Sequence, residues 1–199
     1  MGRTSEAREK LLNSSIELIT QRSFTSVGVQ ELCNHAGVKK GSFYHFFNSK
    51  QDLTIASLDI IWNDLKNGVL IPIKNAECSL EEKLNLLHYK FYEHYKNSKE
   101  CKGCIAGCPL GNLALEMSTL DENIRVKVEE IFNKWVEFFE EIIADAQRLN
   151  EIPQNVNTKA TAKSIVAYIE GLSLLGKAFN NIEIIKNLGC VIKRILIYD

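Results

Sequence analysis

The sequence predicts an all-α protein, with an N-terminal three-helix domain of the helix-turn-helix type and a larger helical domain for ligand binding and dimerisation. Apolar residues recur at steps of three and four in almost every segment, whereas strand-like alternation is never sustained. Of the 199 residues, 45% are hydrophobic and 25% are charged, with 3 Pro and 11 Gly, which is typical of a folded, helix-rich chain. We expect the domains to span residues 1–48 and 49–199.

The first two helices are predicted from their apolar positions. The first helix ends near Arg22, and its apolar residues are Leu11, Leu12, Ile16, Leu18 and Ile19. The second helix has about two turns, with Leu32, Cys33 and Ala36 facing inward. Gly37 fits the left-handed position that ends such a helix, so Gly37 and Val38 form the expected turn.

A short basic and aromatic helix is expected from Lys39 to Phe47. Ser49 then caps a fourth helix, because its hydroxyl can accept from the amide three residues on and Asp52 favours the positive helix end. The apolar positions of this helix are Leu53, Ala56, Ile60, Ile61 and Leu65. Asn67 and Gly68, followed by Pro72, indicate where it stops.

Five further segments complete the expected helical domain. Ser79 caps a helix with Leu84, Leu87, Phe91 and Tyr95 on one stripe, residues 101–108 are irregular, and Pro109 opens a short helix reaching Met117. Ser118 or Thr119 caps a long helix, whose apolar positions are Ile124, Val128, Ile131, Trp135, Phe138, Ile142 and Leu149. Thr158 caps a helix to about Phe179, and the last helix spans residues 183–198.

The last two helices are apolar over more than one face. Their apolar positions are Ile165, Val166, Ile169, Leu172, Leu174, Leu175, Ile184, Ile185, Leu188, Val191, Ile192, Ile195 and Leu196. Both faces of such a helix must be buried, inside the monomer or against a partner. We expect a homodimer through these two helices.

The N-terminal residues of the third helix fit the reading of double-stranded DNA. A recognition helix places its first residues on base edges in the major groove. Lysines bond guanine or phosphate, a serine reads an edge at close range, and glycine permits close approach. The predicted DNA-contacting residues are Lys39, Lys40, Gly41, Ser42, Tyr44, His45 and Lys50. Phe43, Phe46 and Phe47 are expected to be core.

The charge distribution agrees with a polyanionic partner for the N-terminal segment. The net charge is −1, but residues 1–50 carry seven Lys or Arg against four acidic residues. No stretch approaches the ~18–20 consecutive apolar residues of a membrane span, and the N-terminus lacks the apolar region of a secretory signal. We expect a cytoplasmic protein with no membrane partner.

Residues 4–53 resemble the DNA-binding domain of the TetR family of transcriptional regulators. The pattern is carried by Gly37, Val38, Lys40, Gly41, Ser42, Phe43, Tyr44, His45, Phe46, Ser49, Lys50, Asp52 and Leu53. The resemblance implies an obligate dimer that represses nearby genes and releases its operator DNA when a small molecule occupies the C-terminal domain. It also implies that the last two helices form the dimerisation bundle.

The effector must be inferred from local chemistry, since C-terminal domains of this family diverge. Aromatic and apolar residues of the middle helices, with a few polar groups, can line a pocket. The predicted pocket residues are Trp62, Phe91, Tyr95, Cys108, Asn112, Leu113, Met117, Trp135 and Phe139. His88 and Glu116 are further polar candidates.

Three cysteines, Cys101, Cys104 and Cys108, lie within eight residues and admit three hypotheses. A metal site would need His88 or His94 as a fourth ligand. A thiol sensor would be centred on Cys108, since Lys102 and the helix that starts at Pro109 favour its thiolate; residues 107–116 are similar to a branch of the family that includes electrophile-responsive repressors. The third hypothesis is structural cysteines beside a hydrophobic effector site.

No cofactor or metal is predicted, and no enzyme. The sequence contains no phosphate-binding glycine loop, no His-Glu-x-x-His and no nucleophile elbow. The predicted function is a dimeric DNA-binding repressor released by a small hydrophobic or thiol-reactive effector. A helical protein–protein adaptor without DNA binding is the alternative.

Overall fold

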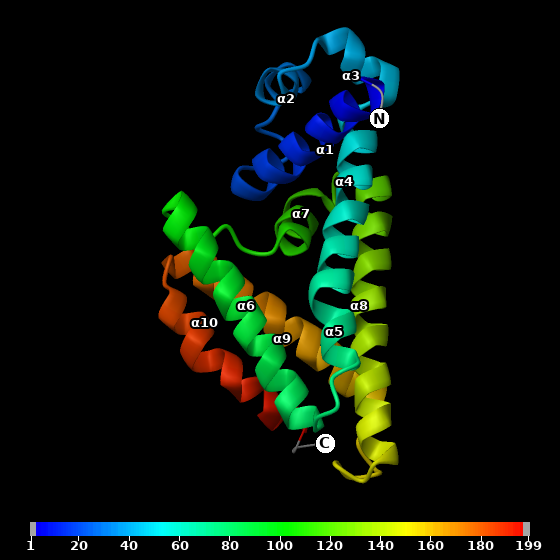
Figure 1. Ribbon diagram of the computed structural model, residues 1–199, viewed down its shortest axis with the longest axis vertical. Coiled ribbons are helices and arrows are strands. Elements are labelled where there is room, and N and C mark those ends of the chain that lie inside the picture. The colour runs from blue at the N-terminus through cyan, green and yellow to red at the C-terminus, as the bar shows by residue number, and fades with distance from the viewer. Residues whose placement is uncertain (1–2, 197–199) are drawn as a thin grey trace. The chain divides into compact units, whose positions relative to one another are not determined.

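A computed structural model describes residues 3–196, and every regular element in that range is a helix (Figure 1). The chain forms two compact units. Unit 1 contains the described residues up to Asn63 together with Pro109–Glu129, and unit 2 contains Asp64–Cys108 and the described residues from Glu130 onward. The units do not follow the predicted boundary after residue 48, which stays a prediction.

Unit 1 is built around the N-terminal helices. Its elements are α1 (Arg3–Gln21), α2 (Val29–Ala36), α3 (Lys40–Phe46), most of α4 (Lys50–Leu65), α7 (Pro109–Met117) and the start of α8 (Glu122–Arg148). The first three pack on one another around a common core (Figure 1). Its fully or nearly fully buried residues are Leu11, Leu12, Leu18, Val27, Leu32, Cys33, Ala36, Phe43, Phe47 and Leu53.

The predicted helix-turn-helix boundaries are confirmed. Gly37 has φ 64° and ψ 32°, and its amide bonds to the carbonyls of the preceding turn. This left-handed conformation disfavours any side chain with a Cβ atom, so glycine ends α2 here. At the next boundary the Ser49 hydroxyl accepts a 3.0 Å hydrogen bond from the Asp52 amide, which starts α4.

The prediction that the fourth helix stops near Asn67 and Gly68 is wrong. α4 continues through a π-helical turn at Lys66–Leu70 (η1) directly into α5 (Ile71–Lys74). Pro72 lies in the first turn of α5, where its missing N–H costs least. The wider π turn gives the Ile71 amide the Lys66 carbonyl as its acceptor, so the helical path continues past a glycine and a proline.

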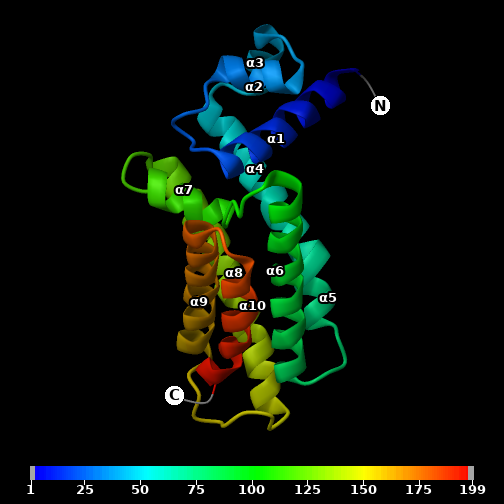
Figure 2. The same ribbon diagram turned by 90° about the vertical axis from the view of Figure 1, so that its left-hand side faces the viewer.

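Unit 2 is a bundle in which α10 (Ile182–Gly189) packs against α6 (Leu80–Lys102) and α9 (Thr158–Phe179), as Figures 1 and 2 show. The predicted capping box at the start of α6 is present, since Ser79 and Glu82 bond each other's backbone amides. Gly189 allows the close approach of α10 to α6, because a Cβ there would lie 2.1 Å from the His88 ring.

Two other predicted boundaries need correction. Asp121, rather than Ser118 or Thr119, accepts from the Ile124 amide at the start of α8, so the predicted cap was placed too early. Asn157 caps α9 one residue before Thr158. In both cases a neighbouring carboxylate or amide oxygen takes a position that a hydroxyl could also have filled.

The predicted ends of three helices also differ. α6 includes Cys101, so the irregular connection begins only at Gly103, in the left-handed conformation. Leu149 follows α8 and is 65% exposed instead of packed. The last predicted helix is divided into α10 and a 3₁₀ segment, Cys190–Leu196, and Tyr198 lies outside the described residues. No helix of residues 3–196 is both long and apolar enough to cross a membrane.

Candidate DNA-reading surface and effector cavity

The N-terminal end of α3 presents the predicted DNA-contacting residues to solvent. Lys39, Lys40 and Gly41 are exposed and Ser42 is half-buried. One turn further, Tyr44 is 52% exposed. His45 is exposed as well, with its ring 4.8 Å from that of Phe46. These side chains therefore lie on the exposed side of one short helix, from its N-cap to its last turn, as a recognition helix requires.

The opposite side of α3 anchors it in the core of unit 1. Phe43 is fully buried and Phe47 is 5% exposed, and their ring centroids lie 6.1 Å apart. Phe46 is half-buried against the same core. The prediction that these aromatics are core residues is therefore confirmed, and the helix has a buried aromatic side and a polar exposed side.

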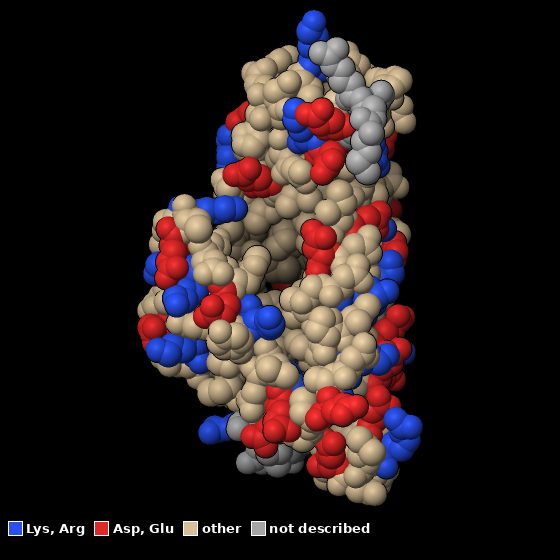
Figure 3. Space-filling view, viewed as in Figure 1, with Lys and Arg blue, Asp and Glu red and all other residues tan. Residues whose placement is uncertain are grey.

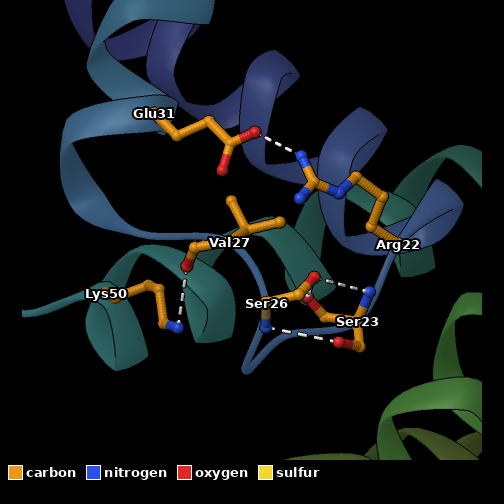
Figure 4. A network of polar contacts seen from close by, with 6 residues as sticks. All are labelled: Arg22, Ser23, Ser26, Val27, Glu31 and Lys50. Atoms are coloured by element: carbon orange, nitrogen blue, oxygen red, sulfur yellow. Dashed lines mark hydrogen bonds and ion pairs between the residues drawn. The ribbon is translucent and has the colours of Figure 1, made fainter.

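Lys50, another predicted DNA contact, is half-buried, and its ammonium is bonded within unit 1. Its ammonium donates hydrogen bonds to the Phe24 carbonyl at 2.7 Å and to the Val27 carbonyl at 2.9 Å, and Figure 4 shows the second of these. It also lies 3.8 Å from the centroid of the Phe24 ring. Partial burial lowers the pKa of Lys50, although the Glu116 carboxylate opposes that effect. Lys50 therefore fastens the connection between α1 and α2 to the first residue of α4.

Glu116 holds the same connection from α7 and is not a pocket residue as predicted. Its two carboxylate oxygens accept from the Phe24 amide at 2.7 Å, the Thr25 amide at 2.9 Å and the Thr25 hydroxyl at 2.6 Å. Partial burial acts to raise the pKa of Glu116, but the hydrogen bonds from Thr25 and Phe24 outweigh it and hold the pKa below its usual range. No local pattern in the sequence joins residue 116 to residues 24 and 25.

Two more polar contacts tie α4 to the segment after α7 within unit 1. The Gln51 side-chain amide donates to both carboxylate oxygens of Asp121, at 2.7 and 2.6 Å. Lys127 forms an ion pair with Asp59 at 2.6 Å. α7 and the start of α8 are therefore integral parts of the DNA-reading unit, although they lie about 70 residues further along the chain.

Unit 2 contains a small apolar cavity of about 30 Å³ between α6, α9 and α10. The residues that line it are Leu87, His88, Phe91, Tyr95, Ile169, Leu172, Ser173, Ile185, Gly189 and Ile192. Of the predicted pocket residues, the structure brings Phe91 and Tyr95 to this cavity, together with the polar candidate His88. The sequence analysis missed its α9 and α10 walls, because the apolar faces of these helices were assigned to dimerisation.

The other predicted pocket residues are distributed over both units. Trp135 and Phe139 are buried in unit 2 without lining the cavity, and the Trp135 ring lies 6.1 Å from that of Phe91. Cys108 also belongs to unit 2 without lining the cavity. The remaining predicted residues belong to unit 1, namely Trp62, Asn112, Leu113 and Met117. The structure therefore does not gather the predicted set around the cavity of unit 2.

The polar end of the cavity is formed by Tyr95 and Ser173, both almost fully buried. Their hydroxyls lie 2.7 Å apart, and Ser173 in turn donates to the Ile169 carbonyl. Burial raises the pKa of Tyr95 far above its ordinary value, with smaller contributions from the nearby Cys108 and Glu170. At neutral pH the cavity therefore presents a neutral hydroxyl pair.

The three clustered cysteines lie in different environments. Cys101 and Cys104 are exposed, and Cys108 is half-buried beside Glu170, with which it forms a hydrogen bond. Burial raises the pKa of Glu170, and the Cys108 contact opposes it. Lys102, which was expected to act on Cys108, is recorded beside His94, where it adds to the effect of burial in lowering the pKa of that histidine.

No cluster of three or more His, Cys, Asp or Glu that could hold a metal is present in the part of the chain that the structure describes. In that part all six cysteines are free thiols. Cys33 is buried in unit 1, where burial raises the pKa of its thiol although Lys40 opposes it. Cys190, by contrast, is exposed.

Comparison with known proteins decides the family. Residues 11–56 match the model of bacterial regulatory proteins of the tetR family, and residues 83–188 match the tetracyclin repressor-like C-terminal domain. The chain belongs to the TetR family. It is therefore a DNA-binding transcriptional regulator, and the adaptor alternative is excluded. TetR-family regulators bind operator DNA and typically act as homodimers with small-molecule effectors.

The relatives of this TetR-family chain are regulators as well. An uncharacterised HTH-type regulator of Lactococcus lactis is 28% identical over 184 residues, covering 90% of this chain and 88% of the relative. The repressor DhaR of a Mycobacterium species is 25% identical over 183 residues, covering 92% and 88%. Among solved structures, reduced NemR of E. coli has a TM-score of 0.79 at 24% identity, covering 96% of this chain and 97% of that one, which shows the shared fold.

Proposed function

We propose that this regulator represses transcription as a homodimer, and that each copy reads operator DNA through the N-terminal end of α3. The proposed contacts are Lys39, Lys40, Gly41, Ser42, Tyr44 and His45. One observation carries the assignment: the same seven-residue helix buries Phe43 completely and exposes its basic and polar residues at one end. The buried side of α3 is therefore packed in the core of unit 1, and its opposite side is accessible to DNA.

The first residues of α3 and those one turn further on contact different parts of the DNA. Lys39, Lys40 and Ser42 meet base edges, because the first residues of a recognition helix point into the major groove. Tyr44 and His45, one turn on, contact phosphates. Two copies bind half-sites about 34–36 Å apart, which is one turn of DNA.

The DNA contact is tested by the salt dependence of operator binding. Lys40→Ala removes one phosphate or base contact, so the slope of log K against log salt should decrease by about 1. Lys90→Ala is the matched control, because Lys90 is an exposed lysine on α6 of unit 2. Fluorescence anisotropy with DNA from upstream of the gene measures both. Equal slopes for the two variants would reject the placement of α3 in the groove.

The dimer interface is proposed on α9 and α10, whose apolar side chains are left exposed in the single chain. Leu174 is 51% exposed, Leu175 40%, Phe179 67% and Leu188 41%. Exposed apolar clusters of this kind mark interaction surfaces. Phe179→Glu should shift the dimer to monomer in sedimentation velocity, whereas Leu149→Glu, at an equally exposed leucine after α8, should not. A dimer that survives Phe179→Glu would place the interface elsewhere.

The effector is proposed to be a small hydrophobic or thiol-reactive molecule bound within unit 2. The walls of the cavity fit the first class, since they are apolar except for His88, Tyr95 and Ser173, and a cavity of about 30 Å³ must widen to admit such a molecule. An effector must favour the arrangement that does not bind DNA.

The thiol-reactive class is supported by Cys108, which lies beside Glu170 and close to Tyr95. The similar E. coli protein NemR was solved in a reduced form. N-ethylmaleimide tests this class: the thiol sulfur adds to the C=C bond and the proton ends on the adjacent carbon. If Cys108 is the sensor, treatment releases the operator from the wild type and from Cys101→Ser but not from Cys108→Ser. Retained binding in all three would leave only a non-covalent effector.

A further inference from the structure

The connection between α1 and α2, residues 22–28, is irregular, so its backbone groups need partners from outside a helix. Part of this need is met locally, because Ser23 and Ser26 bond each other's amides (Figure 4). Phe24 and Val27 anchor the connection in the core, being 9% and 0% exposed. The remaining contacts come from two charged side chains on other helices.

One of the two charged side chains binds backbone amides of the connection, and the other binds its carbonyls. Glu116 of α7 accepts from the amides of Phe24 and Thr25, whereas Lys50 of α4 donates to the carbonyls of Phe24 and Val27. The Glu116 charge raises the pKa of Lys50 against the effect of burial, so the two charges attract each other across the connection. The Phe24 backbone is therefore bonded to α7 through its N–H and to α4 through its C=O.

This arrangement matters for DNA reading because the connection leads directly into α2. The chain passes from Val27 through Gly28 into Val29, the first residue of α2, and α2 packs on α3. Arg22 at the start of the connection also pairs with Glu31 on α2 (Figure 4). A shift of residues 24 and 25 therefore changes how the helix-turn-helix is oriented on α1 and α4.

We propose that Glu116 is a positioning residue for operator binding: its carboxylate fixes the α1–α2 connection so that α3 is presented correctly to DNA. Glu116 itself does not contact DNA. Through this carboxylate, α7 sets operator affinity, and any movement of α7 that withdraws Glu116 weakens DNA binding.

The other polar contacts of the same region do not reach the connection. Gln51 with Asp121, and Lys127 with Asp59, join α4 to the segment that follows α7. These contacts stabilise unit 1 at a different place from residues 22–28. Among the charged side chains of α7 and the start of α8, the recorded contacts with Phe24 and Thr25 come from Glu116.

The test compares Glu116→Gln with Glu122→Gln in the full chain. Both remove one carboxylate charge in unit 1, but Glu122 is exposed and its ion pair is with Arg125 of its own helix. Glu116→Gln should raise the operator dissociation constant at least about tenfold, the equivalent of one lost charge-assisted hydrogen bond. The salt slope should stay at the wild-type value, because no phosphate contact is removed. Hydrogen exchange of the Phe24 and Thr25 amides should accelerate.

Thr25→Val provides a second variant in case Glu116→Gln does not fold. It removes only the hydroxyl that donates to Glu116 and keeps the size of the side chain, and Thr25→Ser restores the hydroxyl. Operator binding should weaken in Thr25→Val and recover in Thr25→Ser. The proposal is overturned if folded Glu116→Gln binds operator within twofold of Glu122→Gln, if its salt slope falls as for a lost phosphate contact, or if Thr25→Val leaves affinity and amide exchange unchanged.

Discussion

Replacement of Lys50 by methionine separates a structural lysine from a DNA-contacting one. Methionine keeps the apolar stem and removes the ammonium that donates to the Phe24 and Val27 carbonyls at 2.7 and 2.9 Å. Hydrogen bonds from a charged donor contribute about 1.5–3 kcal/mol each, and the contact with the Phe24 ring adds about 0.5–1 kcal/mol. Because Lys50 is only half-buried, water replaces part of these contacts in the variant, and we expect a loss of stability below this sum, about 2–4 kcal/mol.

Thermal unfolding followed by circular dichroism measures this loss. For a chain of this size, 1 kcal/mol corresponds to about 2–4 °C, so Lys50→Met should lower Tm by about 5–15 °C. Lys40→Met is the control, since Lys40 is exposed on α3, and it should change stability by no more than about 0.5 kcal/mol. If Lys50→Met unfolds at the same temperature as Lys40→Met, the two carbonyl contacts do not hold unit 1 together and the reasoning is refuted.

Two further predictions concern backbone and pH. Gly37→Ala should destabilise the protein by about 1–2 kcal/mol, because residue 37 has a positive φ of 64°, which strains the backbone of alanine even though no atom would clash with its Cβ. Gly41→Ala, in the helical backbone of α3, should stabilise the protein by about 0.5–1 kcal/mol and weaken operator binding. Urea unfolding measures the two changes in stability, and fluorescence anisotropy measures operator binding. Stability changes of the same sign in Gly37→Ala and Gly41→Ala would contradict the prediction. The pKa of Glu116 is lower in the folded state, so its stabilisation is present above the unfolded value of about 4.3 and is lost as pH falls through the folded value. The stability difference between wild type and Glu116→Gln should therefore be constant from pH 7 to about 5 and shrink below about 4; a constant difference throughout would mean that the Glu116 charge does not stabilise the fold.

The helix-turn-helix could be predicted because its boundaries depend on neighbouring residues. Gly37 ends α2 through its own backbone conformation, and Ser49 starts α4 through an amide three residues away. Phe43 is buried because its position in the three-four pattern faces the core. Such signals act within one or two turns of helix, so a single sequence displays them.

The roles of Lys50 and Glu116 could not be predicted, because their partners are distant in the chain. Glu116 bonds to Phe24 and Thr25, which lie 92 and 91 positions earlier in the chain. Lys50 bonds to Phe24 and Val27, which lie 26 and 23 positions earlier. A lysine at a helix start beside a basic cluster resembles a phosphate contact until the carbonyls that accept from it are known. The cavity walls were missed for the same reason, since helix order does not show which face of α9 meets α6.

The path past Gly68 and Pro72 illustrates a different limit. Both residues usually end a helix, and the sequence therefore indicated a stop. The π-helical turn at Lys66–Leu70 shifts the hydrogen-bond pattern by one residue, and Pro72 then falls in a first helical turn. Local propensity was outweighed by an irregularity that costs little and keeps the helical path continuous.

The most direct test of the central claim is a hydroxyl-radical footprint of the purified regulator on DNA from upstream of its gene, with wild type and Tyr44→Ala compared. A dimer that reads DNA through α3 should protect two half-sites whose centres lie about 34–36 Å apart, and five base pairs inserted between them should abolish both footprints. Tyr44→Ala should weaken protection of both half-sites equally. A single protected site, or protection unaffected by the insertion and by Tyr44→Ala, would contradict a dimer with α3 as its reader.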